Sequence, residues 1–268
     1  MSIRTIALAA ATALALGAGG LAGPAAAAEF SDAQRAEIEG IVKDYVTGHP
    51  EFIRDYLIAN PEVIREAIDA LQARQEEADR AAQASIIDDN RELLFSSPRH
   101  VVMGNAEGDI TLVEFFDYNC GYCRRAQEDM HRLIEDDPNL RVVLKEFPVL
   151  GEGSMQAAQV SIAVRILAPE KAADFHEALL AQSGQVDTEV ALAVAESLGL
   201  DRGAIEAEMR SDEVRDTIGE SYALAEKLQL TGTPSYVTSG EVAIGAIGFD
   251  ALQSKIADAR SSCAAETC

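Results

Sequence analysis

The middle of the chain carries two short segments in which apolar residues run together, Ile110–Phe116 and Arg141–Phe147. Such runs are typical of strands that are buried on both faces. Between them, apolar residues recur at helical spacing from Cys120 to about Asp136. A strand, a helix and a second strand in this order predict a βαβ unit with parallel strands. Val101–Met103, just before this unit, is expected to form an edge strand.

A long Ala-rich stretch follows, from Ser154 to Leu228, and it is interrupted at Pro169, Gly184 and Gly199. It predicts a helical insertion. Three further elements and one turn complete the chain: a strand at Ser235–Thr238, a turn at Ser239-Gly240, a strand at Val242–Ile244 and a helix from about Asp250 to Arg260. The order β-α-β, helical insertion, β-β-α places the chain in the α/β class.

Residues 29–97 are predicted to form a helical N-terminal arm, ahead of a main domain at 98–268. Ser31 and Gln34 have the spacing of a capping box. Two similar segments follow, His49-Pro50-Glu51 and Asn60-Pro61-Glu62. Each places a capping residue before a proline at the first helical position and a glutamate in the first turn, where backbone amides favour negative charge. Thin amphipathic helices of this kind cannot bury a core by themselves.

The end of this arm differs in character, because Gln72–Gln83 consists mostly of Ala, Arg, Gln and acidic residues. It has helical propensity but almost no apolar face. One interpretation is an arm that packs on the main domain. The other is an oligomerisation module followed by a polar stalk, since a helix that is polar all round often bridges separate bodies. We expect the second.

The first 28 residues have the pattern of a secretory signal peptide. Arg4 precedes an apolar run from Ile6 to Leu16, and small residues at Ala25–Ala28 provide a cleavage site. The run is shorter than the ~20 residues that a membrane span needs. We therefore expect cleavage near Ala28 and export to the periplasm.

Composition excludes two broad classes. The 268 residues are 48 % hydrophobic and 25 % charged, which is the balance of a globular protein and excludes wholesale disorder. With 22 basic and 45 acidic residues, the formal net charge is −23. Nucleic-acid binding needs clustered Lys and Arg, and the sequence has no basic stripe, so no nucleic-acid partner is expected.

The four cysteines form two pairs along the chain, Cys120-Gly-Tyr-Cys123 and Cys263 with Cys268. Outside the cytosol such pairs form disulfides that are structural or catalytic. The first pair begins a predicted helix, whose unpaired amides and partial positive charge stabilise a thiolate on Cys120. Two intervening residues bring the second sulfur within disulfide reach. We expect Cys120 to be the exposed, acidic nucleophile and Cys123 the more buried resolving thiol.

Other roles for these cysteines are less favoured. A zinc site would need four ligands, and the second pair lies far along the chain without a suitable context. A purely structural Cys120–Cys123 disulfide closes too small a loop to stabilise much. Cys263 and Cys268 are expected to form a disulfide in the C-terminal tail, with capture of copper or zinc as the alternative. No metal site or cofactor is predicted.

These residues carry a family resemblance. The segment Phe115–Cys123, together with Gly232-Thr233-Pro234 far downstream, resembles the DsbA-like thiol–disulfide oxidoreductases of the thioredoxin fold. The resemblance covers roughly Val101–Arg260. The N-terminal arm, with its Asn-Pro-Glu helix, is similar to the exported ScsC-like branch that is linked to copper tolerance. The resemblance implies a thioredoxin fold with a helical insertion, preceded by an α-helical arm. Similarity to the ScsC-like branch also implies a homo-oligomer, a trimer, formed through that arm.

The resemblance also implies roles for three further residues. Pro234 matches the loop that faces the cysteines in this family, where a cis peptide exposes the backbone of Thr233 for pairing with substrate. Glu114 matches a buried acid of the family. A buried carboxylate is costly without a role or a partner. It either relays protons to Cys123 or forms a structural ion pair, for which Lys145 on the next strand is a candidate.

Together these patterns predict a periplasmic thiol–disulfide oxidoreductase and isomerase. Cys120, Cys123, Thr233, Pro234 and Glu114 form its expected catalytic site. Its expected partners are cysteine-containing exported proteins, a membrane protein that resets the cysteines by thiol–disulfide exchange, and further copies of the chain. The alternative is a Cu(I)-binding, copper-tolerance protein that uses the same soft thiolates as ligands.

Overall fold

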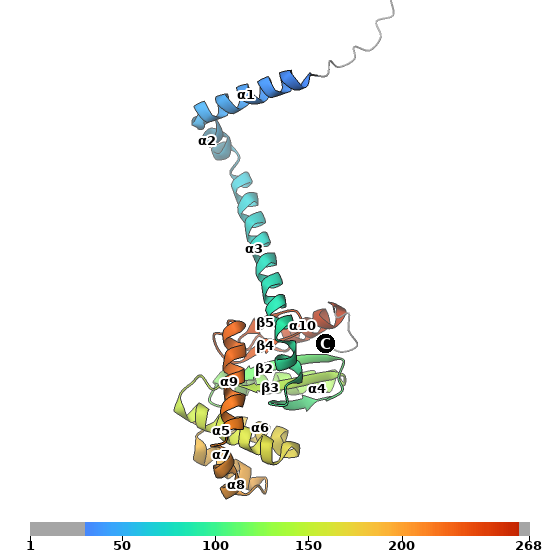
Figure 1. Ribbon diagram of the computed structural model, residues 1–268, viewed down its shortest axis with the longest axis vertical. Helices are drawn as coiled ribbons and strands as arrows, with labels where there is room; N and C mark the ends of the chain where they lie inside the picture. Colours follow the sequence, from blue (N-terminus) through green and yellow to red (C-terminus); the bar gives the residue numbers. More distant parts are fainter. Residues whose placement is uncertain (1–29, 263–268) are drawn as a thin grey trace, which may run out of the picture. The chain divides into compact units, whose positions relative to one another are not determined.

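The computed structural model describes residues 30–262 (Figure 1). Along the sequence they divide into two units, one up to Ile68 and one from Asp69. The predicted signal peptide at 1–28 lies outside the described residues, and so do Cys263 and Cys268 with their expected disulfide. No helix within 30–262 is long and apolar enough to cross a bilayer.

The first unit, up to Ile68, is entirely helical in its described part. It contains α1 (Asp32–Gly48), α2 (Pro50–Ala59) and the beginning of α3 (Pro61–Asp89). The capping box of Ser31 and Gln34 is present, and proline opens α2 and α3 as expected.

His49 and Asn60 are expected to cap the helices that follow them, but their side chains bond to the helices that precede them. The His49 ring lies 2.9 Å from the carbonyl oxygen of Tyr45, and the Asn60 amide donates to that of Tyr56 at 2.8 Å. Each side chain therefore satisfies a carbonyl at the end of the preceding helix, which is the other place where helices leave backbone groups unpaired. The prediction that His49 caps the helix after it is wrong for its side chain.

Helices α1 and α2 contain no buried residue. Several large apolar side chains are instead exposed along them, among them Ile41 at 62 %, Tyr56 at 54 % and Ile58 at 70 %. Monomeric soluble proteins rarely leave an apolar face of this kind uncovered. The first unit thus has the amphipathic character that the sequence indicates, without a core of its own.

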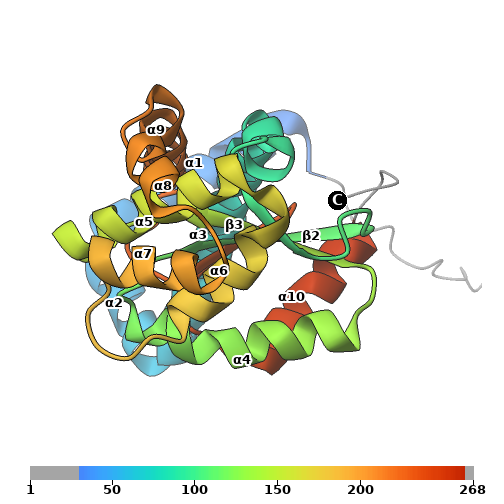
Figure 2. The same cartoon turned by 90° about the horizontal axis from the view of Figure 1, so that it is seen from below.

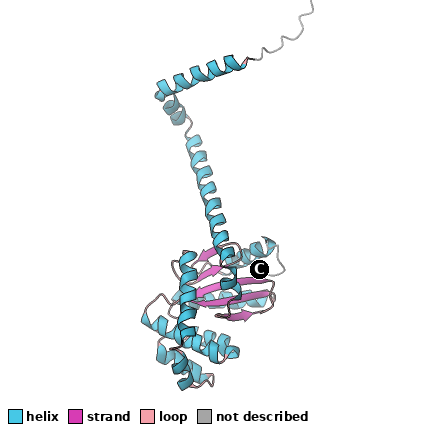
Figure 3. Cartoon of the chain, viewed as in Figure 1, coloured by secondary structure: helices cyan, strands magenta, loops and turns pink. Residues whose placement is uncertain are grey.

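In the second unit, residues 69–262 contain one mixed sheet with strand order β1-β3-β2-β4-β5. Strands β2 and β3 are parallel, and the other three pairings are antiparallel. The strands are β1 (Val101–Gly104), β2 (Ile110–Phe116), β3 (Leu140–Glu146), β4 (Ser235–Val237) and β5 (Val242–Ile244). The predicted βαβ unit and the edge position of the first strand are confirmed. Figure 3 shows the strands of this unit gathered in one sheet with helices around it.

Side chains alternate between the two faces of the sheet, so each face has its own core. One face includes Leu112 and Phe116 of β2, and it packs against α4 (Gly121–Asp136) and α10 (Phe249–Ser262). Figure 2 shows α4 and α10 on the same side of β2. Cys120 and Cys123 belong to this core.

The other face carries Val113 and Phe115 of β2. It is covered by Ile87 near the end of α3, by a π-helical turn at Glu92–Ser96 and by Leu224 of α9. The last part of α3 therefore packs with the sheet, inside the range 29–97 that the sequence assigns to the arm.

The predicted insertion between β3 and β4 is mostly helical. It is interrupted at the three expected places, and a further break at 209–211 is not predicted by the sequence pattern. Pro169 begins a short 3₁₀ turn, and Gly184 and Gly199 adopt positive φ angles of 84° and 79°, a backbone conformation that suits glycine. The helices are α5 (Glu152–Leu167), α6 (Ala172–Leu180), α7 (Thr188–Ser197), α8 (Arg202–Glu208) and α9 (Asp212–Lys227). Secondary structure and sheet order together confirm the α/β class.

Candidate active site

The cysteine motif lies where the chain leaves β2 and enters α4. Cys120 is the N-cap residue of α4, and its backbone amide donates to the carbonyl of Asp117 at 3.0 Å. The backbone amide of Cys123 points back at the Cys120 sulfur, 3.4 Å away. The sulfur therefore occupies the place of a capping oxygen, where unpaired amides and the helix dipole favour negative charge.

Two polar side chains hold this turn in place. The carboxylate of Asp117, which is 1 % exposed, accepts hydrogen bonds from the backbone amides of Asn119, Val149 and Leu150 at 2.8–2.9 Å. The Asn119 side chain in turn bonds both backbone groups of Val186, at 2.7 and 2.9 Å. The turn before Cys120 is thus fixed to the loop after β3 and to the helical insertion.

The two free thiols have opposite acidities. The pKa of Cys120 falls to about 5, chiefly because the Cys123 thiol donates a hydrogen bond to its sulfur. Hydrogen bonds with Thr233 and with backbone amides lower the pKa further, whereas burial raises it. The hydrogen bond between the two thiols raises the pKa of Cys123, and burial raises it further. One sulfur is therefore poised as a thiolate at neutral pH while the other keeps its proton.

The expectation that Cys120 is exposed is wrong, because its residue is only 5 % exposed. Its thiol contacts the carbonyl oxygen of Thr233 at 3.2 Å, so the loop before β4 covers it. Cys123 is more buried still, at 0 %. The peptide bond between Thr233 and Pro234 is cis, as the resemblance implies.

Glu114 lies in the middle of β2, on the face that packs with the two cysteines. Its residue is 5 % exposed. Burial raises the pKa of its carboxyl to about 8, and the negative charge of Cys120 contributes to the rise. The structure therefore brings together all five residues that the sequence analysis selects.

Lys145 is not the partner of Glu114. In the parallel pairing of β2 and β3, Glu114 lies opposite Leu144, and Lys145 lies opposite Phe115. Since neighbouring residues of a strand point to opposite faces, Lys145 points to the other side of the sheet. There its ammonium group bonds the Glu220 carboxylate at 2.7 Å and the Leu93 carbonyl at 2.6 Å.

The surface next to the motif is partly apolar. Tyr122, between the two cysteines, is 62 % exposed, and the Arg125 guanidinium lies over its ring at 4.3 Å from the centroid. Val149 and Leu150, which Asp117 anchors, are 41 % and 55 % exposed. An extended peptide that approaches Cys120 would meet this surface.

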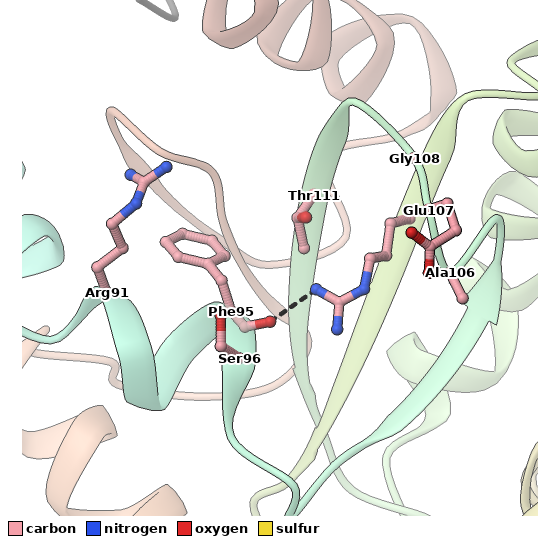
Figure 4. A pocket seen from close by; sticks show the side chains of 8 residues that line it. Arg91, Phe95, Ser96, Ala106, Glu107, Gly108 and Thr111 are labelled. Carbon is pink, nitrogen blue, oxygen red and sulfur yellow. Dashed lines mark hydrogen bonds between the residues drawn. The ribbon is translucent and has the colours of Figure 1, made fainter. Parts of the chain in front are cut away.

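A surface pocket of about 390 Å³ lies elsewhere in the second unit (Figure 4). Thr111, at the start of β2, is one of its lining residues, and Arg141 beside it donates to the Phe95 carbonyl at 2.6 Å. The cysteine motif follows the opposite end of β2, and none of the five selected residues lines this pocket. Residues 30–262 also contain no cluster of three His, Cys, Asp or Glu side chains arranged to hold a metal.

Sequence reasoning missed three residues beside the cysteines. Asp117 and Asn119 hold the turn, and both lie within the motif that carries the resemblance. Tyr236, two residues after Pro234, lies directly opposite Glu114 in the pairing of β2 with β4. In the sequence, only the short distance between Tyr236 and Pro234 could have drawn attention to it. Its contact with Glu114 depends on strand pairing between segments that lie far apart in the sequence.

Two protein families match this chain. Residues 111–257, which make up more than half of the 268 residues, match the family described as DSBA-like thioredoxin domain. Residues 51–78 match the family described as copper resistance protein ScsC N-terminal domain.

Solved structures resemble both parts of the chain. A thioredoxin-like oxidoreductase from Silicibacter pomeroyi DSS-3 is 42 % identical, with 65 % of this chain and 99 % of that chain covered and a TM-score of 0.62. Proteus mirabilis ScsC in a transitional conformation is 26 % identical, with 87 % of this chain and 98 % of that chain covered and a TM-score of 0.61.

Curated relatives are much longer than the matching region. A Salinispora arenicola protein named Na(+)/H(+) antiporter NhaA 1 is 28 % identical over 163 residues, or 60 % of this chain. The chain spans about a quarter of the length of such relatives, 25 % in this case.

Proposed function

Because this chain belongs to the DsbA-like thioredoxin-domain family and carries an N-terminal segment of the ScsC type, we propose that it is a thiol–disulfide oxidoreductase that forms and reshuffles disulfides in exported proteins. The observation that carries this proposal is the contrast between its two thiols. Cys120 has a pKa of about 5 at the start of α4, and Cys123 beside it keeps its proton.

In the oxidised form, a substrate thiolate attacks the sulfur of Cys120. The Cys120–Cys123 bond breaks, a mixed disulfide with the substrate forms, and the bonding electron pair leaves with Cys123, which takes up a proton. A second substrate thiolate then attacks its partner sulfur in the mixed disulfide and releases Cys120 as a thiolate. The substrate gains a disulfide, and the protein is left with two reduced cysteines.

In the reduced form, the Cys120 thiolate attacks a wrong disulfide of the substrate and releases one substrate thiolate. That thiolate can then attack another substrate disulfide, which reshuffles the pairing. If the substrate does not free Cys120, Cys123 attacks the mixed disulfide and releases a reduced substrate. The backbone of Thr233, whose carbonyl lies against the Cys120 sulfur, is the proposed docking site for the substrate segment next to its cysteine.

We also propose that the arm makes the protein a homo-oligomer, which by similarity to the ScsC-like branch is a trimer. The support is the exposed apolar surface of α1 and α2, which contain no buried residue. Burying these faces between copies would hold several CGYC sites near one misfolded substrate and raise their effective concentration. That arrangement favours isomerisation over simple oxidation.

The same proposal places the protein in the periplasm. It rests on the signal-peptide pattern of the first 28 residues and on the extracytoplasmic conditions under which disulfides persist. Cysteine-containing exported proteins are then its substrates, and a membrane thiol–disulfide exchange protein returns its cysteines to the active redox state.

A role in copper tolerance is the second candidate, because residues 51–78 match a family named for copper resistance. Two adjacent sulfurs, one of them a thiolate, suit a soft ion such as Cu(I). Under this alternative the reduced protein would bind one Cu(I) per CGYC motif, and Cys120→Ser would abolish that binding.

Reactivation of scrambled ribonuclease, measured beside the reduction of insulin disulfides, tests the main proposal. The full-length protein should catalyse both reactions, and Cys120→Ser should catalyse neither. Stoichiometric Cu(I) binding by a protein that catalyses neither reaction would favour the alternative instead.

A further inference from the structure

Tyr236 lies beside the candidate active site without belonging to the cysteine motif or to the Thr233–Pro234 loop. It is directly opposite Glu114 in the antiparallel pairing of β2 with β4, and residues opposed in this way place their side chains on the same face. That face packs with Cys123. All three residues are buried, with exposures of 2 % for Tyr236, 5 % for Glu114 and 0 % for Cys123.

The Tyr236 hydroxyl is buried, and no group within residues 30–262 lies at the distance and angle of a hydrogen bond to it. The Glu114 carboxyl is nevertheless close enough for this hydroxyl to favour its ionised form. A buried hydroxyl without a full partner costs free energy, which a phenylalanine of nearly the same shape would avoid. In the resting state, therefore, the hydroxyl does not explain why tyrosine occupies this position.

Titratable groups reach Tyr236 from β2 and α4, whereas its partner on β5 is Ala243, which does not titrate. Glu114 lies across from it on β2, and Cys120, Cys123 and Asp129 lie on or at the start of α4. Burial and the negative charges of these groups raise the pKa of Tyr236. The hydroxyl consequently keeps its proton at neutral pH and acts toward a carboxylate as a donor.

We propose that Tyr236 is a positioning residue for the step in which Cys123 resolves a mixed disulfide. Its hydroxyl donates a hydrogen bond to Glu114 when that carboxyl is ionised, and thereby holds Glu114 as the acceptor of the Cys123 proton. This inference rests on the proposed thiol–disulfide exchange at the CGYC motif and adds to it a device that controls one of its steps.

Cys123 transfers its thiol proton to the Glu114 carboxylate, and the resulting thiolate attacks the Cys120 sulfur of the mixed disulfide. The Cys120–Cys123 bond forms, and the bond between Cys120 and the substrate sulfur breaks. The substrate sulfur leaves with the electron pair as a thiolate, and Glu114 later returns its proton to solvent.

The two steps can be separated with 5,5′-dithiobis(2-nitrobenzoate) and the reduced full-length protein. Attack by Cys120 releases one coloured thiolate, and attack by Cys123 on the resulting mixed disulfide releases a second. Stopped-flow absorbance then gives a rate for each phase as a function of pH. The variants to compare are Tyr236→Phe, Glu114→Gln and the double variant.

Tyr236→Phe should leave the first phase unchanged. Its second phase should be slower by about tenfold at pH 7, with a pH profile shifted upward by about one unit, because the Glu114 carboxylate has lost its donor. Glu114→Gln should remove the pH dependence of the second phase. In the double variant, the added Tyr236→Phe change should alter the second-phase rate by less than about twofold, because the effects of residues that act together are not additive.

Tyr118→Phe is the matched control, because the Tyr118 hydroxyl is also buried but bonds Ser161 at 2.8 Å. It should lower the unfolding midpoint and leave the second-phase profile unchanged, whereas Tyr236→Phe should not lower the midpoint. A Tyr236→Phe profile identical to that of the wild type would overturn the inference, as would an undiminished effect in the Glu114→Gln background. If the wild-type protein released no coloured thiolate at all, the proposed function itself would fail.

Discussion

Glu114 and Lys145 lie on adjacent strands and point to opposite faces of the sheet, so neither neutralises the other. On one face, burial and the negative charge of Cys120 raise the pKa of Glu114 to about 8, and the Tyr236 hydroxyl opposes this rise. On the other, the buried Lys145 side chain bonds Glu220 at 2.7 Å. The sheet thus separates a carboxyl that is available for proton transfer from an ion pair that serves the fold.

The first prediction concerns the pH dependence of stability. The pKa of Glu114 is about 8 in the folded protein, against an ordinary value of 4.5. Between these values the unfolded chain has lost this proton while the folded protein keeps it, so this group's contribution to stability falls as pH rises. Glu114→Gln should therefore gain stability relative to the wild type from pH 4.5 to 8, by at most about 1.4 kcal/mol per pH unit.

Urea unfolding of both reduced proteins across this range provides the measurement. A difference between the two free energies of unfolding that stays constant with pH would show that Glu114 ionises normally. A second variant, Asp129→Asn, alters a half-buried carboxylate on α4 and serves as the control for a general effect of removing a nearby charge.

The second prediction concerns the ion pair on the other face. Lys145→Ala should destabilise the protein by at most about 3–5 kcal/mol, because the Glu220 carboxylate, 8 % exposed, loses its partner at 2.7 Å and keeps the Arg99 guanidinium at 3.7 Å. Lys255 offers the control, since its pair with Glu241 has the same 2.7 Å distance but is partly exposed. Lys255→Ala should cost at most about 1 kcal/mol in the same denaturant titration. Equal losses for the two variants would contradict the difference in burial.

The third prediction assigns the roles of the two sulfurs. Cys120→Ser should abolish exchange, because it removes the acidic nucleophile. Cys123→Ser should instead accumulate mixed disulfides with substrate, since nothing is left to release them. Iodoacetamide at mildly acidic pH, followed by mass spectrometry, should label Cys120 first in the reduced wild-type protein. Faster labelling of Cys123 would reverse the assignment.

The fourth prediction concerns the arm. Ile41→Glu combined with Ile58→Glu places charges on two of its most exposed apolar positions, which are 62 % and 70 % exposed. Light scattering should then report a monomer that still oxidises dithiols but reactivates scrambled ribonuclease several-fold more slowly, because the sites have lost their high effective concentration. Deletion of residues 29–68 should have the same effect. It spares Gln83, whose side chain accepts a hydrogen bond from the Val242 amide in the second unit.

A full-length protein that is already monomeric would remove the basis of this prediction. The chain would then be a plain oxidase with a helical arm. Glu37→Lys, a change at an exposed polar position of α1, serves as the control for a nonspecific effect of charge and should leave the assembly intact.

Much of the fold follows from local patterns in the sequence. The strand at Ile110–Phe116 begins and ends where its apolar run does, and Cys120 precedes the helix as the cysteine spacing requires. These features depend on neighbouring residues alone, so they can be inferred without knowledge of the tertiary structure. The breaks at Pro169 and Gly199 are local in the same sense.

The features of the site that the sequence does not predict depend on strand pairing and on contacts between distant segments. The register of β2 with β3 decides that Lys145 points away from Glu114, and a shift of one residue would reverse this. The pairing of β2 with β4 places Tyr236 opposite Glu114 although more than 100 residues separate them. The burial of Cys120 under Thr233 is likewise a contact between distant segments.

The proposed exchange chemistry depends on the acidity of Cys120, which thiolate absorbance at 240 nm measures as a function of pH. The reduced protein should show a transition near pH 5 that is absent from Cys120→Ser. In Cys123→Ala the midpoint should move upward, because the thiol that stabilises the Cys120 thiolate is gone. If the reduced wild-type protein showed no transition below pH 7, or if the transition persisted in Cys120→Ser, Cys120 would not be the acidic thiol that the proposed function requires.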